Sequence, residues 1–567
     1  MLTAKQCKYF SIYDKKEIKR LNKLFEKYNE LKDAIQQDPY YIYCDICGWT
    51  FTKADKLIIQ RYPNFKNSKD RCNRAMQYAI KSYAYTYGST KMMAASMYNN
   101  LVKVAPECVD YTMDCVNDEQ FYYDESDKSI TLSYLYQDEK NIARAIKRRL
   151  GKCKPYDWDI EKYRKLDGVE FTDEQMTILR LARDNKIAIL SGSAGTGKSA
   201  ATKALVTMLE NNGQTYQMLA PTGIAAKRLR EATGRKASTI HMYLLDADVE
   251  LDYLIIDEFS MVGVELLSML LSLPTITNET RFIFICDEAQ LASISPGNII
   301  ENLLDYGKIP MARLTKVFRY GIGGIATIAT DIRNGKMIDM SQEWPDARCD
   351  EYDDKVQHNI IYWLNRALEN YNINDILLLT PKKIGNLGTY RLNAIIQDWT
   401  NGNGAHLEQF DYIIKDRGQE YPVEFHIGDK VINVKNNYSA LTSAGEYGII
   451  MNGEIGIVTR IIDMDGDDYL CVQFDNDEIA YSKKEIRNLQ LAYALTCHKV
   501  QGQQAKCVIF LAHEDSAFML TRNLMYVAVS RAQEMLYIIS NEDVIESGLT
   551  KQETNSRMTY LNKLLED

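Results

Sequence analysis

A glycine-rich run in the middle of the chain has the residue types and spacing of a phosphate-binding loop. It fits the pattern G-x-x-x-x-G-K-S and consists of Gly192, Ser193, Ala194, Gly195, Thr196, Gly197, Lys198 and Ser199. Glycines let backbone N–H groups wrap around phosphate oxygens, and the N-terminus of a following helix adds a favourable dipole. We expect the Lys198 ammonium to reach the β- and γ-phosphates of ATP and the Ser199 hydroxyl to bind Mg2+.

An acidic pair further along the chain supplies the second half of a nucleotide-hydrolysing site. The segment LIIDEFSM places Asp257 at the end of an apolar strand, where its carboxylate can hold Mg2+, partly through water. Glu258 beside it can orient and deprotonate an attacking water. Two acids at a strand end are commonly a solvated terminus, but downstream of a phosphate-binding loop the catalytic interpretation is favoured.

Further segments carry polar side chains directly after apolar runs. CDEAQLASISPG places Asp287 and Gln290 at a strand tip, where the Gln290 amide can touch a γ-phosphate. LTKVFRY presents Arg319 and YVAVSRAQ presents Arg531, each positioned to meet an anionic ligand. The segment TCHKVQG, residues 496–502, combines hydroxyl, imidazole, ammonium and amide groups on one turn. Each segment alone is typical of a surface loop, and only their order along the chain indicates a site.

The elements that must position these groups are short apolar strands alternating with helices, which predicts an α/β fold with parallel sheets. The expected strands of the first unit cover residues 186–190, 216–220, 253–257 and 281–286. A helix is expected from Lys198 to a stop at Asn211–Gly213. A second unit of the same type begins at Asp375–Thr380.

Changes in sequence texture divide the chain into four parts. We expect a mainly helical N-terminal domain over 1–165, a first α/β domain over 166–335, and a second α/β domain over 336–400 and 485–567. Residues 401–484 alternate apolar and polar positions between Gly, Asn and Asp clusters. This pattern predicts a small antiparallel barrel or sandwich inserted into the second α/β domain.

Composition excludes several classes of protein. The 567 residues are 46% hydrophobic and 26% charged, which excludes a mainly disordered chain, and no apolar run is long enough to span a membrane. The N-terminus lacks the apolar run of a signal peptide, so we expect a cytoplasmic protein of a bacterium or a phage-infected host. The net charge of −9 confines any nucleic acid to a local groove. Twelve cysteines fit a reducing compartment, and Cys44-x-x-Cys47 is a weak zinc signal without a histidine pair nearby.

The ordered set of motifs resembles superfamily 1 helicases of the 5′→3′ branch, RecD-like first and Dda-like second. The resemblance implies two RecA-like P-loop motor domains and an SH3-like β-barrel for 401–484. DPYYIYCDICGWT in the N-terminal part is similar to a helix-hairpin-helix region that precedes the motor in RecD-like proteins. The implied activity is ATP-dependent helicase or translocase action on single-stranded DNA, in replication, recombination or repair. A compact chain rich in Tyr, Lys and Asn is compatible with a phage origin.

The resemblance also implies roles for individual residues. FTDEQMTIL makes Gln175 the adenine reader, and Gln504 is carried over as a nucleotide contact. Contacts to the single strand are implied for Thr222, Thr239, His241, Thr496, His498, Lys499 and Gln501. The expected partners are single-stranded DNA and single/double-strand junctions, together with single-strand-binding or replication and recombination proteins; no membrane is expected.

Relatives in this branch carry a strand-separating β-hairpin, the pin, in the first motor domain. Such a hairpin needs about ten strand residues and a turn, and the segment from His241 to Asp257 leaves little room for one. We therefore expect a short or missing pin. Two alternatives stay open: a translocase that separates strands weakly, and a P-loop regulatory switch without nucleic acid, which only the acidic charge favours.

Overall fold

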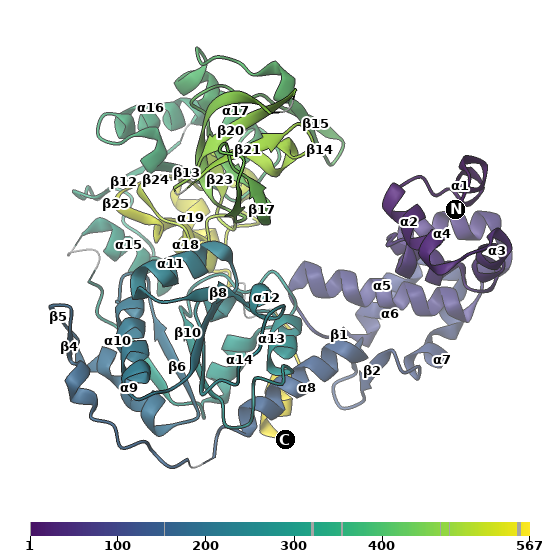
Figure 1. The fold of residues 1–567 in the computed structure, drawn as a ribbon, viewed down its shortest axis with the longest axis horizontal. Helices are drawn as coiled ribbons and strands as arrows, with labels where there is room; N and C mark the ends of the chain where they lie inside the picture. Colours follow the sequence, from purple (N-terminus) through teal and green to yellow (C-terminus); the bar gives the residue numbers. More distant parts are fainter. Residues whose placement is uncertain are drawn as a thin grey trace.

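Two parallel β-sheets form the centre of the computed structural model, which describes residues 2–567 except 152, 319–322, 353–354, 465, 476 and 553–556. Figure 1 shows the first sheet below the second, with a separate helical lobe formed by the N-terminal residues at the side. The α/β class with two parallel-sheet domains and a helical N-terminal region is confirmed.

The first sheet has the strand order β11-β6-β10-β9-β7-β8, and every pairing in it is parallel. Its strands are β6 (Ile187–Gly192), β7 (Tyr216–Ala220), β8 (Ala237–Thr239), β9 (Tyr253–Ile256), β10 (Arg281–Cys286) and β11 (Met311–Leu314). Its helices are α9 (Asp173–Asp184), α10 (Lys198–Asn211), α11 (Gly223–Thr233), α12 (Ile240–Tyr243), α13 (Val264–Leu271) and α14 (Ile299–Tyr306). The central strands β6, β9 and β10 are buried along their whole length, as strands covered by helices on both faces must be.

The second sheet has the strand order β12-β25-β24-β13-β23 and is also parallel. Its strands are β12 (Ala347–Asp350), β13 (Ile376–Thr380), β23 (Ala494–Thr496), β24 (Ala505–Leu511) and β25 (Ala532–Ile539). Its helices are α15 (Gly324–Arg333), α16 (Val356–Leu368), α17 (Thr389–Asn401), α18 (Arg522–Val529) and α19 (Glu542–Leu549). Helix α15 packs its apolar face against α18 and joins the core of this second domain, although the expected boundary at 335 assigns it to the first.

The insert in the second domain is antiparallel. Its main sheet has the order β21-β20-β19-β16-β22, so the edge strands β21 and β22 do not pair with each other among the described residues. The strands are β16 (Lys430–Asn433), β19 (Ile455–Met464), β20 (Asp467–Gln473), β21 (Glu478–Ser482) and β22 (Leu489–Leu491). Two hairpins accompany the sheet: β14 (Tyr412–Asp416) with β15 (Gln419–Val423), and β17 (Asn437–Leu441) with β18 (Tyr447–Ile450).

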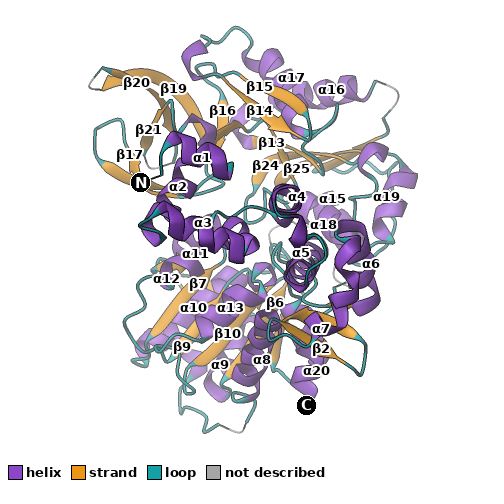
Figure 2. Cartoon of the chain, turned by 90° about the vertical axis from the view of Figure 1, so that its right-hand side faces the viewer, coloured by secondary structure: helices purple, strands orange, loops and turns teal. Residues whose placement is uncertain are grey.

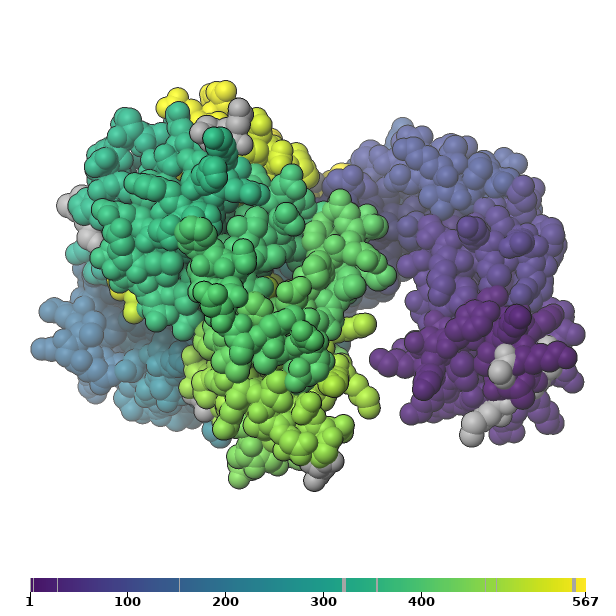
Figure 3. Space-filling view, turned by 90° about the horizontal axis from the view of Figure 1, so that it is seen from above, coloured from purple at the N-terminus to yellow at the C-terminus, as the bar shows by residue number. Residues whose placement is uncertain are grey.

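The N-terminal lobe is mainly helical with one small sheet. It contains α1 (Ala4–Phe10), α2 (Lys15–Leu24), α3 (Tyr28–Gln37), α4 (Phe51–Arg61), α5 (Lys69–Tyr87), α6 (Ala94–Val104), α7 (Thr112–Val116), α8 (Ser133–Lys147), β1 (Met92–Met93), β2 (Phe121–Asp124) and β3 (Ser129–Leu132). Figure 2 shows α4, α5 and α6 in front of the motor domains, and Figure 3 shows an open gap between the lobe and the insert. Cys44 and Cys47 are free thiols of this lobe, and burial raises their pKa values to about 11 and 12.

The last residues of the chain tie the N-terminal lobe to the first motor domain. Helix α20 (Leu561–Glu566) packs against α8 and α14. The backbone N–H of Tyr560 donates to the buried Glu139 carboxylate at 3.0 Å, and Lys563 pairs with Asp124 at 2.6 Å. These residues therefore serve a different part of the protein from the second α/β domain, in which the sequence expectation places them.

No strand forms between α12 and β9, a segment that the structure describes completely. The same holds for the three residues between α11 and β8. The expected absence of a two-stranded hairpin in this region is confirmed. Among the described residues, no helix combines the length and apolar character that crossing a membrane requires.

Candidate nucleotide site and nucleic-acid groove

The glycine-rich run forms the turn between β6 and α10. Gly195 and Gly197 have positive φ values of 82° and 84°, a conformation that residues with a Cβ rarely adopt. A Cβ on Gly197 would lie 2.4 Å from the Gln175 amide nitrogen, so any other residue there would also have to displace the end of the Gln175 side chain. The loop thus has the tight backbone that the phosphate-binding pattern predicts.

Two polar side chains close over this loop. The Lys198 ammonium donates to the carbonyls of Gly192 at 2.6 Å and Ser193 at 3.2 Å. Gln175 is buried, caps helix α9 through Thr172, and donates from its amide nitrogen to the loop carbonyl of Thr196 at 3.4 Å. Gln175 therefore contacts the loop backbone, and its expected role in reading adenine stays a prediction.

The acidic pair follows β9, next to β10 and one strand removed from the loop. Burial, and then the neighbouring Glu258 carboxylate, raise the pKa of Asp257, while the Lys198 ammonium lowers it. Glu258 has a positive φ of 48°, and strain of this kind in a non-glycine residue concentrates at functional sites. One carboxylate oxygen of Glu258 is buried without a hydrogen-bond partner among the described residues.

A tyrosine from the second motor domain reaches into the same site, and the sequence analysis missed it. The Tyr526 hydroxyl, on α18, donates to the buried Asp287 carboxylate at 2.8 Å. It also accepts a hydrogen bond from the loop N–H of Ala194 at 3.1 Å. Asn523, one turn earlier, donates to the backbone carbonyl of Gln290 at 3.2 Å. Tyr526 opens the segment YVAVSRAQ, where only the arginine was singled out.

Replacing Tyr526 with Phe is expected to lower the free energy of unfolding by about 1–3 kcal/mol, because one oxygen of the buried Asp287 carboxylate loses the hydroxyl that donates to it. The measurement is denaturant unfolding of the full chain, followed by a signal from both motor domains. Tyr362→Phe, on the exposed face of α16, is the matched control and should leave stability unchanged. Equal stability of both variants would mean that the contact between the domains contributes nothing.

The remaining predicted nucleotide contacts do not all meet at the loop. Arg319 lies outside the described residues. Arg531 is buried and donates within its own domain, to the carbonyls of Val527 at 3.0 Å and Gln503 at 3.2 Å. Gln504 accepts from Gln533 at 3.1 Å and lines a separate cavity. The structure therefore brings Lys198, Glu258 and Gln290 near the loop, but gives Arg531 and Gln504 other neighbours.

The residues at the site fit a bound Mg-nucleotide. The buried Gln290 amide oxygen, like the free Glu258 oxygen, has no hydrogen-bond partner among the described residues. Buried polar atoms of this kind usually face a water, an ion or a ligand. The buried Asp257 carboxylate also lies within the electrostatic influence of the Lys198 ammonium, which lowers its pKa. Asp257 and Ser199 are the residues that would hold Mg2+.

A groove of about 760 Å³ lies between the two motor domains. Five of the seven residues predicted to contact DNA line it: Thr222, Thr496, His498, Lys499 and Gln501. The first domain also contributes Ile294, and the second contributes Phe518, which is 77% exposed. Apolar and aromatic groups among polar ones suit a strand whose bases stack while its backbone is held.

Basic residues give this groove a positive character within an acidic protein. Lys382, Lys383 and Lys499 line it, together with Arg417 from the turn of the β14–β15 hairpin. Burial, and then the Lys383 charge, lower the pKa of Lys499 to about 8. A phosphate that binds beside such a lysine stabilises its protonated, charged form.

Thr239 and His241 do not line this groove. Thr239 is buried, caps α12 by accepting from the Met242 N–H at 3.2 Å, and borders a neighbouring cavity with Tyr438 of the insert. His241 is exposed on α12. The groove instead includes Lys382 and Lys383, from the segment that resembles the opening of the second RecD-like motor domain, and Arg417 of the insert; none of the three is among the predicted DNA contacts.

Comparison with protein families gives three matches along the chain. The AAA domain family matches residues 170–348, and the UvrD-like helicase C-terminal domain family matches residues 491–539. The ATP-dependent RecD2 DNA helicase HHH domain family matches residues 12–91. The first segment covers the first motor domain and extends through α15 to the start of β12, the second lies in the second motor domain, and the third lies in the N-terminal lobe.

Individual relatives cover most of the chain at low identity. The ATP-dependent RecD2 DNA helicase of Deinococcus radiodurans is 28% identical over 456 residues, which cover 77% of this chain and 58% of that protein. The RecBCD enzyme subunit RecD of Mycolicibacterium smegmatis is 25% identical, covering 71% of this chain and 76% of that one. The ATP-dependent DNA helicase dda of Enterobacteria phage T4 is 34% identical over 168 residues, covering 26% of this chain and 38% of that one. The match thus spans less than two thirds of the Deinococcus relative.

Proposed function

Because this chain is a RecD2-like protein of the superfamily 1 helicases, we propose that it is an ATP-dependent motor that moves along single-stranded DNA and opens duplexes. Two of its relatives are ATP-dependent DNA helicases, which supports this function. The proposal includes movement with 5′→3′ polarity and a role in replication, recombination or repair. It also includes an SH3-like fold for the insert.

One observation carries the proposal: the groove and the phosphate-binding loop are both built across the same pair of domains. Thr222 from the first domain and Lys499 from the second line the groove. Tyr526 from the second domain contacts the loop of the first. A change in domain closure at the loop must therefore change the groove, which is what a motor needs to convert hydrolysis into a step.

The residues at the loop divide the chemistry between them. Glu258 takes a proton from the attacking water, Gln290 contacts the γ-phosphate, and Lys198 compensates the phosphate charge. Mg2+ held by Ser199 and Asp257 supplies further charge compensation when it is bound. Arg319 and Arg531 are proposed to approach as the domains close, which requires the Arg531 guanidinium to leave its present carbonyl partners.

The test is ATP turnover by the full chain with and without single-stranded DNA. We expect DNA to stimulate turnover at least tenfold and 5′-tailed duplexes to be opened in preference to 3′-tailed ones. DNA affinity should fall steeply with salt, because added salt reduces the free energy gained when counterions are released from the DNA. Turnover that ignores DNA would favour the P-loop switch without nucleic acid. A double-stranded blunt duplex serves as the negative control for strand entry.

Affinity for single-stranded DNA is expected to depend on pH through Lys499. In the protein without DNA, Lys499 has a pKa of about 8, and a bound phosphate raises this pKa. Between the pKa of the free protein and that of the complex, DNA binding is therefore coupled to uptake of a proton by Lys499. Affinity should therefore be constant below pH 8 and fall as pH rises above it. Lys499→Arg, which keeps its charge, should remove this slope in fluorescence-anisotropy titrations between pH 7 and 9.5. Lys506→Arg, at a half-exposed position near the start of β24, should keep it. An unchanged slope in Lys499→Arg would remove Lys499 from the binding site.

A second candidate function is translocation with weak strand separation. It is favoured by the absence of a hairpin between α12 and β9. In this case the isolated protein displaces streptavidin from biotinylated single strands rapidly but opens a tailed duplex slowly. Fast unwinding by a monomer would contradict this candidate and would place the wedge elsewhere, for example on the N-terminal lobe across the gap in Figure 3.

A further inference from the structure

Two histidines and a glutamate meet within the insert, and two of them line a cavity that shares Lys383 and Lys499 with the groove. One potential ligand atom each of His406, Glu424 and His426 lies within 4.8 Å of the others. The two imidazole rings have their centroids 5.2 Å apart. We propose that these three residues bind a single Zn2+ ion.

The backbone explains why the three side chains share one face. His406 lies opposite His426 in an antiparallel β-bridge. The flanking residues make the hydrogen bonds: the Leu407 N–H donates to the Phe425 carbonyl at 2.8 Å, and the pairing repeats on the other side at 3.0 Å. This is the non-hydrogen-bonded type of pair, in which side chains approach most closely. Glu424 precedes His426 by two residues and so points to the same side.

In each imidazole, one ring nitrogen lies within hydrogen-bond distance of an acceptor oxygen. The carbonyl of Asn401 lies 3.0 Å from His426 Nδ1, and a carbonyl can only accept, so Nδ1 carries the hydrogen. The Asp411 carboxylate lies 2.9 Å from His406 Nε2 and has the same effect there. In neutral rings the other nitrogen of each histidine is left with a lone pair. Carbonyl and carboxylate partners of this kind orient the histidine ligands of protein metal sites.

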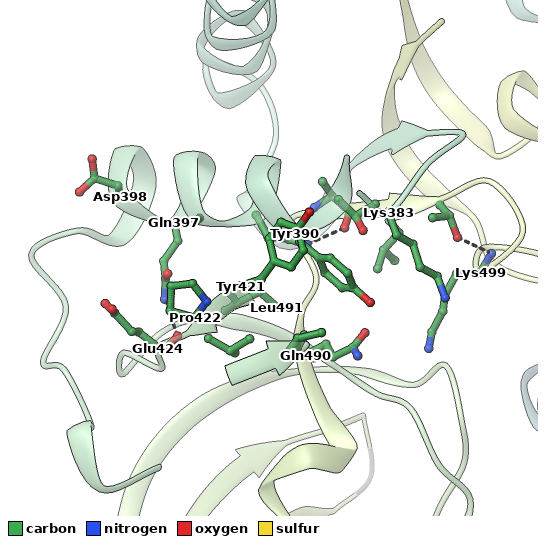
Figure 4. A pocket seen from close by; sticks show the side chains of 18 of the residues that line it. Lys383, Tyr390, Gln397, Asp398, Tyr421, Pro422, Glu424, Gln490, Leu491 and Lys499 are labelled. Carbon is green, nitrogen blue, oxygen red and sulfur yellow. Dashed lines mark hydrogen bonds between the residues drawn. The ribbon is translucent and has the colours of Figure 1, made fainter. Parts of the chain in front are cut away.

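A buried carboxylate holds these supports in place. Asp429 accepts from the Asn401 amide at 2.7 Å, from the His426 backbone N–H at 2.6 Å and from the Gln397 amide at 2.6 Å. The Asn401 carbonyl and the His426 backbone are therefore fixed relative to each other. Figure 4 shows Glu424 at one end of the adjoining cavity, near Gln397 and opposite Lys383 and Lys499.

These three ligand types occur together in protein zinc sites. Two imidazole nitrogens and one carboxylate oxygen suit Zn2+ and leave a fourth position for water. His406 precedes the β14–β15 hairpin, and Glu424 and His426 follow it, so the ion joins the two ends of this hairpin. The hairpin turn brings Arg417 to the groove between the motor domains. Zinc binding would thus hold together the two ends of the β14–β15 hairpin, whose turn lines the groove through Arg417.

The test uses the full chain after removal of metals with a chelator, in buffer that contains millimolar Mg2+ to occupy oxygen-rich sites. Titration with Co2+ is expected to give the visible absorption of a four-coordinate nitrogen and oxygen site at one equivalent, and Zn2+ should abolish it. His426→Ala and Glu424→Gln should weaken Co2+ binding at least tenfold. His358→Ala, an exposed histidine on α16, is the matched control and should bind like the unaltered chain.

Three results would overturn the proposal. One is the absence of visible absorption, and another is equal Co2+ affinity in Glu424→Gln and the unaltered chain. The third is a thiolate-to-cobalt charge-transfer band, which would assign the ion to cysteine ligands, of which Cys44 and Cys47 are the closest pair in the sequence. Because a histidine variant can fail to fold, thermal unfolding is measured as well: Zn2+ should raise the unfolding temperature of the unaltered chain but not that of Glu424→Gln.

Discussion

Lys198→Ala is expected to lower ATP turnover on the order of a thousandfold or more, which amounts to loss of measurable hydrolysis. The Lys198 ammonium lies at the mouth of the loop, on the Gly192 and Ser193 carbonyls, and it is the cation that opposes the buried Asp257 charge. Without it the phosphate charge and the two carboxylates have no compensating ammonium. Steady-state turnover in the presence of saturating single-stranded DNA measures the effect.

A lysine one turn further along the same helix provides the control. Lys203 on α10 pairs with Asp167 at 2.5 Å, away from the loop. Lys203→Ala should keep turnover within about twofold, since an exposed ion pair contributes little. Turnover by Lys198→Ala at the level of Lys203→Ala would remove the ATPase assignment altogether.

Glu258→Gln is expected to keep nucleotide affinity while lowering turnover about 10²–10⁴-fold, the usual contribution of a general base. The amide has nearly the same shape as the carboxylate but cannot accept the proton from water. Glu258 is suited to this role by its position after β9, its strained backbone and its free, buried carboxylate oxygen. Binding of a fluorescent ATP analogue and single-turnover hydrolysis separate the two quantities.

Glu250→Gln, an exposed carboxylate in the loop before β9, is the matched control and should leave both quantities unchanged. Loss of nucleotide affinity in Glu258→Gln, with normal turnover per bound ATP, would show that Glu258 binds and does not act as the base. Single-strand affinity without nucleotide should be unchanged in both variants, because neither residue lines the groove.

Local sequence determined the parts of this protein whose geometry depends on chain neighbours. The loop of residues 192–199 needs glycines at positive φ and a helix directly after it, and both requirements are written in consecutive residues. Asp257 and Glu258 are adjacent and follow a wholly apolar strand. The parallel α/β class follows from apolar strands that must be covered on both faces. These features were therefore predictable from short segments.

Tertiary structure decided the contacts between residues that are far apart in the chain. Tyr526 meets Ala194 and Asp287 only because two separate domains face each other, and no local pattern encodes that distance or angle. The assignment of α15 to the second domain and the separation of Thr239 from the groove depend in the same way on packing. His406 and His426 meet because of strand register, and a shift by one residue would turn them to opposite faces. Register and domain packing are set by the summed burial of many side chains, so they appear only in the folded chain.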